Sequence, residues 1–126
     1  MVQFLTVRYL FSLLFAAMLV AAQSCWKIAA DKSSNPFQAG ASAHTITSFV
    51  FSPLVVGGTV IYLFATFLYM FLLSHYEFSF VQSLAIPGSL IFSILVAITF
   101  FGETLSAVNY AGLLFVTIGI ALLTLR

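Results

Sequence analysis

Long apolar runs separated by short polar stretches dominate the pattern of the chain. Four runs reach the length of about 20 residues that a helix needs to cross a bilayer core. They cover residues 4–26, 49–73, 78–101 and 105–125. None of them alternates with the two-residue period of a barrel strand. The pattern therefore predicts an all-α membrane protein, with a single domain of four transmembrane helices over residues 1–126.

The connections between these runs differ in length and composition. The polar stretches at 74–79 (SHYEFS) and 102–104 (GET) are short, so the last three helices are expected to run as antiparallel neighbours. The first connection, 31–48, is rich in Ser, Ala, Gly and Thr and is typical of a solvent-exposed loop.

The composition excludes several classes of protein. Only 6% of the residues are charged and 63% are hydrophobic, whereas a soluble domain carries about a quarter of its residues as charges. A net charge of +1 offers no basic patch for nucleic acid, and a single cysteine allows no intrachain disulfide. No catalytic motif is present, and His44 and His75 have no acidic partner at metal-ligand spacing. We expect no enzymatic activity, cofactor, metal or nucleic-acid partner.

Lys and Arg near the helix ends leave the orientation in the membrane open. Arg8 and Arg126 fall on one side of the predicted bundle, and Lys27 and Lys32 fall on the other. This balance is compatible with insertion in both orientations, as in an antiparallel homodimer. It is equally compatible with a partner subunit that fixes the orientation, or with one topology set by weaker cues.

The end of the first run raises the question of processing. Small residues at 20–22, before Gln23, fit a signal-peptidase site. A lipid-attachment site fits poorly, because Gln23 and Ser24 rather than small residues precede Cys25. Gln23 and Lys27 stand at positions i and i+4, on one face of a helix. We favour a retained first helix that carries these two polar side chains.

Two stretches resemble a known family. Residues 100–123 (FFGETLSAVNYAGLLFVTIGIALL) combine a helix end, a Gly-acidic turn and a glycine-spaced helix, and residues 20–29 (VAAQSCWKIA) form the second stretch. With four predicted helices, they resemble the four-helix members of the drug/metabolite transporter superfamily. That superfamily includes the small multidrug resistance proteins, the EamA-like transporters and the aminoarabinose-lipid flippase subunits.

The sequence differs from small multidrug resistance proteins at their drug-handling positions. Aligned on Lys27, Leu19 stands where those exporters have a proton-exchanging glutamate. Aligned on the FFG turn, Gln82 and Ala85 stand where they have an aromatic pair. Proton-coupled export of cationic drugs is therefore the weaker expectation.

The flippase subunits are similar to this chain at the end of the first helix and in the third. The matching residues here are Gln23, Cys25, Lys27 and Pro87. The resemblance implies a transporter or flippase subunit in the inner (cytoplasmic) membrane that moves a lipid-linked sugar. It also implies a homodimer, or a heterodimer with a related four-helix subunit, in contact with membrane lipid. A small multidrug exporter and a non-transporting structural subunit of a larger complex are the alternatives.

The candidate substrate-binding residues each have an ordinary structural alternative. Lys27 offers three donors to a phosphate or sugar hydroxyl, with Gln23 one turn deeper, yet interfacial lysines commonly extend to headgroups. Gln82 and Ser83 open the third helix. Pro87 frees a backbone carbonyl, which marks either a broken helix at a transport site or a packing kink.

The turn before the last helix and the glycines within it complete the candidates. Glu103 would contact substrate, or else complement the dipole of the helix that follows. Gly112 and Gly119 are seven residues apart, with Ala111 beside the first. Small residues at this spacing let helices approach closely in lipid. They predict a dimer interface, with packing inside one subunit as the alternative.

Overall fold

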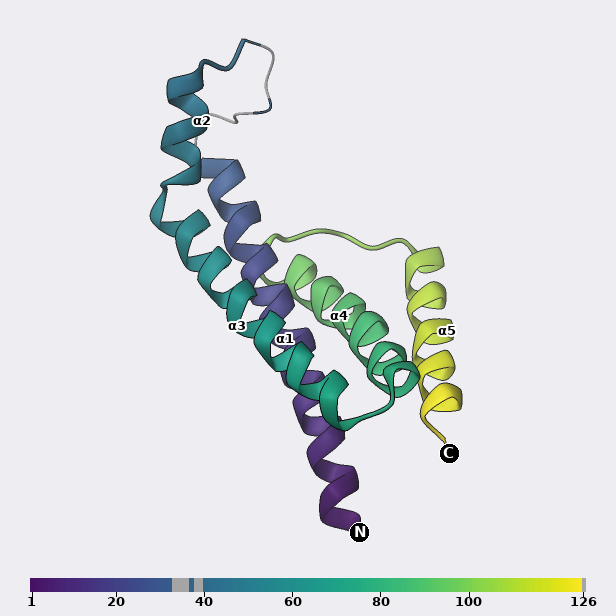
Figure 1. Cartoon of the computed structure of the whole chain (residues 1–126). Helices are drawn as coiled ribbons and strands as arrows, with labels where there is room; N and C mark the ends of the chain where they lie inside the picture. The colour runs from purple at the N-terminus through teal and green to yellow at the C-terminus, as the bar shows by residue number, and fades with distance from the viewer. Residues whose placement is uncertain (33–36, 38–39, 126) are drawn as a thin grey trace.

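The computed structural model describes residues 1–32, 37 and 40–125, and all regular structure within them is helical. Four of the helices are long and one is short (Figure 1). The four long helices are long and apolar enough to cross a bilayer, which confirms the expected all-α fold. The helices are α1 (Val2–Lys32), α2 (Ala43–Val50), α3 (Pro53–His75), α4 (Phe78–Phe100) and α5 (Ala107–Thr124).

Serine caps place two helix starts later than expected. The Ser52 hydroxyl accepts a bond from a backbone N–H of the first turn at 3.4 Å, and Pro53 occupies the first helical position. α3 therefore begins at Pro53 and not at residue 49. Ser106 caps α5 in the same way at 3.4 Å, so that helix begins at Ala107 rather than at residue 105. α1 in contrast runs past the expected range of 4–26 at both ends.

A short helix occupies part of the connection that was expected to be a loop. α2 carries Ile46, Phe49 and Val50 at helical spacing, which gives it an apolar face. Short helices of this kind are typical of the membrane interface. Other parts of the expected loop, residues 33–36 and 38–39, lie outside the described residues.

α1 is the central helix and packs against both α3 and α4. Its buried face toward α4 is built of small side chains, with Ser12 and Ala16 both fully buried. Gly88 of α4 lies opposite: a Cβ added there would stand 3.6 Å from the Cβ of Ala16. Small residues on both helices let the two backbones approach closely, which is a main source of association energy in lipid.

α1 and α3 make a second close contact nearer to Lys27. The Trp26 ring packs over Gly58 of α3, and its Nε1 donates to the Val55 carbonyl at 3.3 Å. Trp26 thus joins α1 to α3. The packing depends on the absence of a side chain at Gly58.

α5 stands at the edge of the bundle (Figure 1). It packs mainly against α4 and has no buried residue among those described. Near its end, the Tyr9 hydroxyl of α1 donates to the Thr124 carbonyl at 3.2 Å. α5 therefore presents most of its apolar surface outward.

Charged residues mark the two ends of the bundle. α1 and α4 run in one direction, while α3 and α5 run in the other (Figure 1). Arg8 and Lys27 are separated along α1 by about 28 Å at the rise of an α-helix. This separation is close to the roughly 30 Å thickness of a bilayer core. Arg126, counted in the charge balance, lies outside the described residues.

Candidate functional site

Lys27 and Glu103 form an ion pair at one end of the bundle. Lys27 Nζ lies 2.6 Å from Glu103 Oε1, and the two side chains are 47% and 48% exposed. The same Nζ lies 4.5 Å from the ring centroid of Phe101. The pair connects the end of α1 to the linker between α4 and α5, so it joins two segments that are distant in sequence.

The end of α4 explains how Glu103 reaches this position. Gly102 has a φ of +63°, which glycine adopts more readily than other residues. The backbone N–H of Glu103 then donates to the Ala97 carbonyl at 3.1 Å, which folds the chain back over the end of α4. Ser106, and not Glu103, caps α5. The Glu103 carboxylate bonds to Lys27 instead of capping that helix.

A partly polar cavity of about 130 Å³ lies beside the ion pair, between α1 and α4. Ser24 in its wall donates to the Val20 carbonyl at 2.7 Å and is thus satisfied within α1. Among the described residues, no hydrogen bond to the Gln23 side chain is found, so its amide is available to a ligand. The lining residues are Val20, Gln23, Ser24, Lys27, Ser93, Val96, Ala97, Phe101 and Glu103.

The structure places the third-helix candidates away from this cavity. Gln82 lies about 22 Å from Ala97 along the axis of α4, at roughly 1.5 Å per residue. Its Nε2 donates to the Tyr69 hydroxyl at 2.7 Å, and Ser83 donates to the Phe80 carbonyl at 3.0 Å. The structure therefore brings Gln23, Lys27 and Glu103 together. Gln82 instead bonds to α3, and Ser83 bonds within α4.

Pro87 does not break α4. The helix continues through it from Phe78 to Phe100. Pro87 lines an apolar groove of about 550 Å³ between α4 and α5, rather than the cavity at Lys27. The expectation of a broken helix at this point is wrong, and Ser93 is the residue that lines both this groove and the cavity at Lys27.

The glycines of α5 lie open. A Cβ added at Gly112 or at Gly119 would meet no described atom within 4 Å. Gly119 lines the 550 Å³ groove, while Gly112 lines a second groove of about 450 Å³. Ala111 is exposed as well. Packing inside one subunit therefore does not explain these small residues, and their surface is free for another helix.

No group of three or more His, Cys, Asp and Glu side chains suited to a metal ion occurs within residues 1–32, 37 and 40–125. The chemistry of the site is thus that of a half-exposed ammonium and carboxylate, with an amide one turn deeper. Such a set can exchange an internal ion pair for a bound anion.

The ion pair was missed by sequence reasoning, which considered Lys27 and Glu103 separately. The turn at Gly102 was the available signal, because it keeps Glu103 at the end of α4.

Comparison of the chain with protein-family models, curated proteins and solved structures finds no match.

Proposed function

We propose that the chain is one subunit of a dimeric, non-enzymatic membrane transporter or flippase of the drug/metabolite transporter type. Its substrate is a lipid-linked sugar or a similar amphipathic molecule, carried across the inner (cytoplasmic) membrane. One observation carries the proposal: the Lys27–Glu103 pair stands beside a partly polar cavity inside a bundle of membrane-spanning helices. Ionisable residues of spanning helices that face a cavity commonly mark a transport path, and here they would stand at its mouth, at one end of the bundle.

The ion pair could switch the site between two states, one in which Lys27 binds Glu103 and one in which Lys27 binds the substrate. A phosphate group competes with the Glu103 carboxylate for Lys27, because both form charge-assisted bonds with an ammonium. Binding of phosphate at Lys27 would release Glu103 and the linker that leads to α5. The Gln23 amide, on the same face of α1, can then bond to a sugar hydroxyl.

The size of the cavity favours a dimer. Ligand sites usually enclose about 300–1,000 Å³, whereas the cavity at Lys27 has about 130 Å³. One chain thus accommodates a headgroup fragment, and a second subunit would complete the site. The open surface around Gly112 and Gly119 offers the contact for that subunit.

A non-transporting structural subunit is the second candidate. It is favoured by the separation of Lys27 from Gln82, which share no cavity among those found in the described part of the chain. A small multidrug exporter fits less well, since α1 carries no Asp or Glu before Asp31, close to its end.

A flipping assay tests the proposal. The purified protein is reconstituted in liposomes with a fluorescent polyprenyl-phosphate sugar, and an external quencher reports movement between leaflets. Lys27→Gln and Glu103→Gln are compared with Lys32→Gln, which removes a similar exposed charge from the end of α1. We expect Lys27→Gln to slow flipping at least about tenfold, the effect of one charge-assisted bond.

The proposal is contradicted if the wild-type protein flips no faster than protein-free liposomes. It is equally contradicted if Lys27→Gln and Lys32→Gln behave alike.

A further inference from the structure

The apolar groove of about 550 Å³ between α4 and α5, the α4–α5 groove, has room for a ligand. Figure 1 shows the two helices beside each other, with α5 outermost in the bundle. Ser89 and Ser93 stand in the α4 wall, and a Cβ added at Gly119 of the α5 wall would meet no described atom within 4 Å. The Ser89 hydroxyl donates to the Ile86 carbonyl of its own helix at 2.7 Å. The groove therefore offers a ligand mainly hydrocarbon contact.

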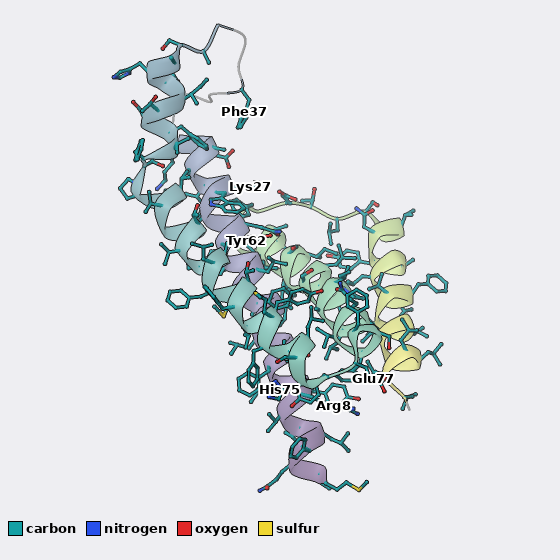
Figure 2. The ribbon with its side chains drawn as sticks, viewed as in Figure 1. Arg8, Lys27, Phe37, Tyr62, His75 and Glu77 are labelled. Carbon is teal, nitrogen blue, oxygen red and sulfur yellow. The ribbon has the colours of Figure 1, made fainter. Side chains whose placement is uncertain are left out.

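The α4–α5 groove meets the cavity at Lys27 at one small side chain. Ser93 lines both hollows, and no other described residue does so. Figure 2 shows Lys27 near the point where the linker leaves α4, at one end of the bundle, and its ion pair with Glu103 ties it to that linker. A charged cavity at the end of the bundle is thus followed by an apolar groove inside it.

The length of this path corresponds to one leaflet of a bilayer. Ala97 lines the cavity, and Ile86 lines the α4–α5 groove. The two residues are about 17 Å apart along α4 at the rise of an α-helix. One leaflet contributes half of a bilayer core, or about 15 Å. A lipid with its phosphate at Lys27 would therefore keep its chain within the leaflet that contains its headgroup.

Two further apolar grooves lie near this path, and neither offers a place for a second chain of the same lipid. The groove of about 450 Å³ at Gly112 shares no residue with the cavity at Lys27. A groove of about 520 Å³ shares Lys27 with that cavity, but it runs past Ala30 toward Phe49 of α2, away from the interior of the bundle. The path inward from the cavity therefore fits a lipid with one chain better than a glycerolipid with two.

The two ends of this path match the two ends of a lipid. An ammonium at the cavity suits a phosphate, and the groove suits a hydrocarbon chain. We propose that the α4–α5 groove holds the prenyl chain of a polyprenyl phosphate lipid whose phosphate binds Lys27. This site rests on the proposed transport function, which identifies the headgroup, and it adds the place of the chain. A second subunit packed on Gly112 and Gly119 would cover the groove from outside.

The phosphate, rather than the chain, holds such a lipid in place. Lipid chains are as apolar as the groove, so the transfer of a chain from bulk lipid into it brings no hydrophobic gain. The charge-assisted bond is made by the headgroup at Lys27. The chain should therefore occupy the α4–α5 groove only while Lys27 binds the phosphate.

Photocross-linking of the chain tests this site in the protein reconstituted in liposomes. The probe is a polyprenyl phosphate with a diazirine a few isoprene units from the phosphate, and labelled residues are identified by chymotryptic digestion and mass spectrometry. We expect residues 86–93 and 116–123 to be labelled at least about tenfold more than the outward face of α3, the ratio given by one charge-assisted bond. Phe64 and Phe67, 64% and 71% exposed, represent that face and report contact with bulk lipid.

Two variants separate the headgroup contact from the chain contact. Lys27→Gln should reduce the groove label to the level of the α3 face, whereas Lys32→Gln should leave it unchanged. Ser89→Phe fills the groove and should lower its label at least about threefold, because overpacking is unfavourable. Thr66→Phe is the control for Ser89→Phe, since Thr66 is exposed on α3, bonds to its own helix at 2.9 Å and lines none of the cavities named above. If circular dichroism shows that Ser89→Phe fails to fold, the half-exposed Lys27→Gln decides.

Competition between lipids identifies the ligand. Unlabelled polyprenyl phosphate should remove the groove label at least about tenfold more effectively than polyprenol, which lacks the charge-assisted bond of the phosphate. It should also compete better than phosphatidic acid, which has a phosphate but two chains.

Four results would overturn the assignment. They are equal labelling of the α4–α5 groove and the α3 face, an unchanged groove label in folded Lys27→Gln, an unchanged groove label in folded Ser89→Phe, and equal competition by phosphatidic acid, which would identify a glycerolipid. Label in the groove without flipping would remove the transport function and leave the site. Flipping with evenly spread label would do the reverse.

Discussion

Two adjacent glycines of α3 have different surroundings. A Cβ at Gly58 would stand 2.8 Å from two atoms of the Trp26 ring and 2.9 Å from the Ala22 carbonyl oxygen. A Cβ at Gly57 would meet no described atom within 4 Å. The Ala22 contact is to the backbone and cannot be relieved by a rotamer change, so a larger residue at 58 must move α1 away from α3.

Gly58→Ala and Gly57→Ala therefore make a matched pair. Both variants gain about the same helix propensity, up to roughly 1 kcal/mol. Overpacking in Gly58→Ala costs about 1–3 kcal/mol. We expect Gly58→Ala to be less stable than Gly57→Ala by that amount when unfolding is measured by titration with sodium dodecyl sulfate in mixed micelles. Equal stability of the two variants would show that Trp26 does not hold α1 to α3.

Residue-level chemistry was only partly predictable from the sequence. Lys27 and Gln23 could be placed on one face of α1, because helical spacing is local. The partner of Lys27 could not be identified, since Glu103 is 76 residues away and approaches through the geometry of one turn. The contact of Arg8 with Phe80 could not be predicted either, because it depends on the packing of α1 with α4.

At the level of elements, the pairing of α3 and α4 includes one polar contact. Gln82 Nε2 donates to the Tyr69 hydroxyl at 2.7 Å, and the Tyr69 ring stacks on Phe15 of α1 at a centroid distance of 5.1 Å. Tyr69→Phe keeps the ring but leaves the Gln82 amide without this acceptor. We expect a loss of about 1 kcal/mol, in the range measured for interhelical bonds in membranes, by the same unfolding titration.

Tyr62→Phe is the control for this change. Tyr62 also lies on α3 and packs against the Trp26 ring at 5.5 Å, without a hydrogen bond from its hydroxyl among the described residues. The free energy of unfolding of the Tyr62→Phe variant should therefore stay near that of the wild type. Gln82→Leu combined with Tyr69→Phe should recover part of the loss, because no half-buried amide is then left unpaired. A loss in Tyr62→Phe equal to that in Tyr69→Phe would contradict this account.

The elements themselves follow closely from hydropathy, and their ends do not. The four long apolar runs are sufficient to identify four spanning helices. The start of α3 at Pro53 depends on a single serine hydroxyl, and α2 is a short helix inside a polar stretch. Such features are set by individual hydrogen bonds, which average hydropathy does not record.

For the whole molecule, the main question is what covers α5. Antiparallel neighbours were expected for the last three helices, but α1 rather than α3 is the main partner of α4 within the described chain. This arrangement leaves α5 attached at the edge, with no buried residue. The position of α5 at the edge could not be predicted from the sequence. The expected turn of three residues (GET) would have held α5 close to α4, whereas the observed linker continues to Ser106 and is longer.

The proposed dimer uses this outer surface and can be tested there. Gly112→Leu combined with Gly119→Leu adds side chains where one subunit has no atom within 4 Å of a Cβ, so the monomer should remain stable. Close approach of a second α5 should be blocked, because helices in lipid associate through small residues.

We expect the dimer fraction of this double variant, counted by single-molecule photobleaching in liposomes, to fall at least about tenfold, since close packing of this kind supplies most of the association. Gly57→Leu, at an equally open glycine of α3, should leave it unchanged. Persistent dimers in the double variant would place the contact on another helix.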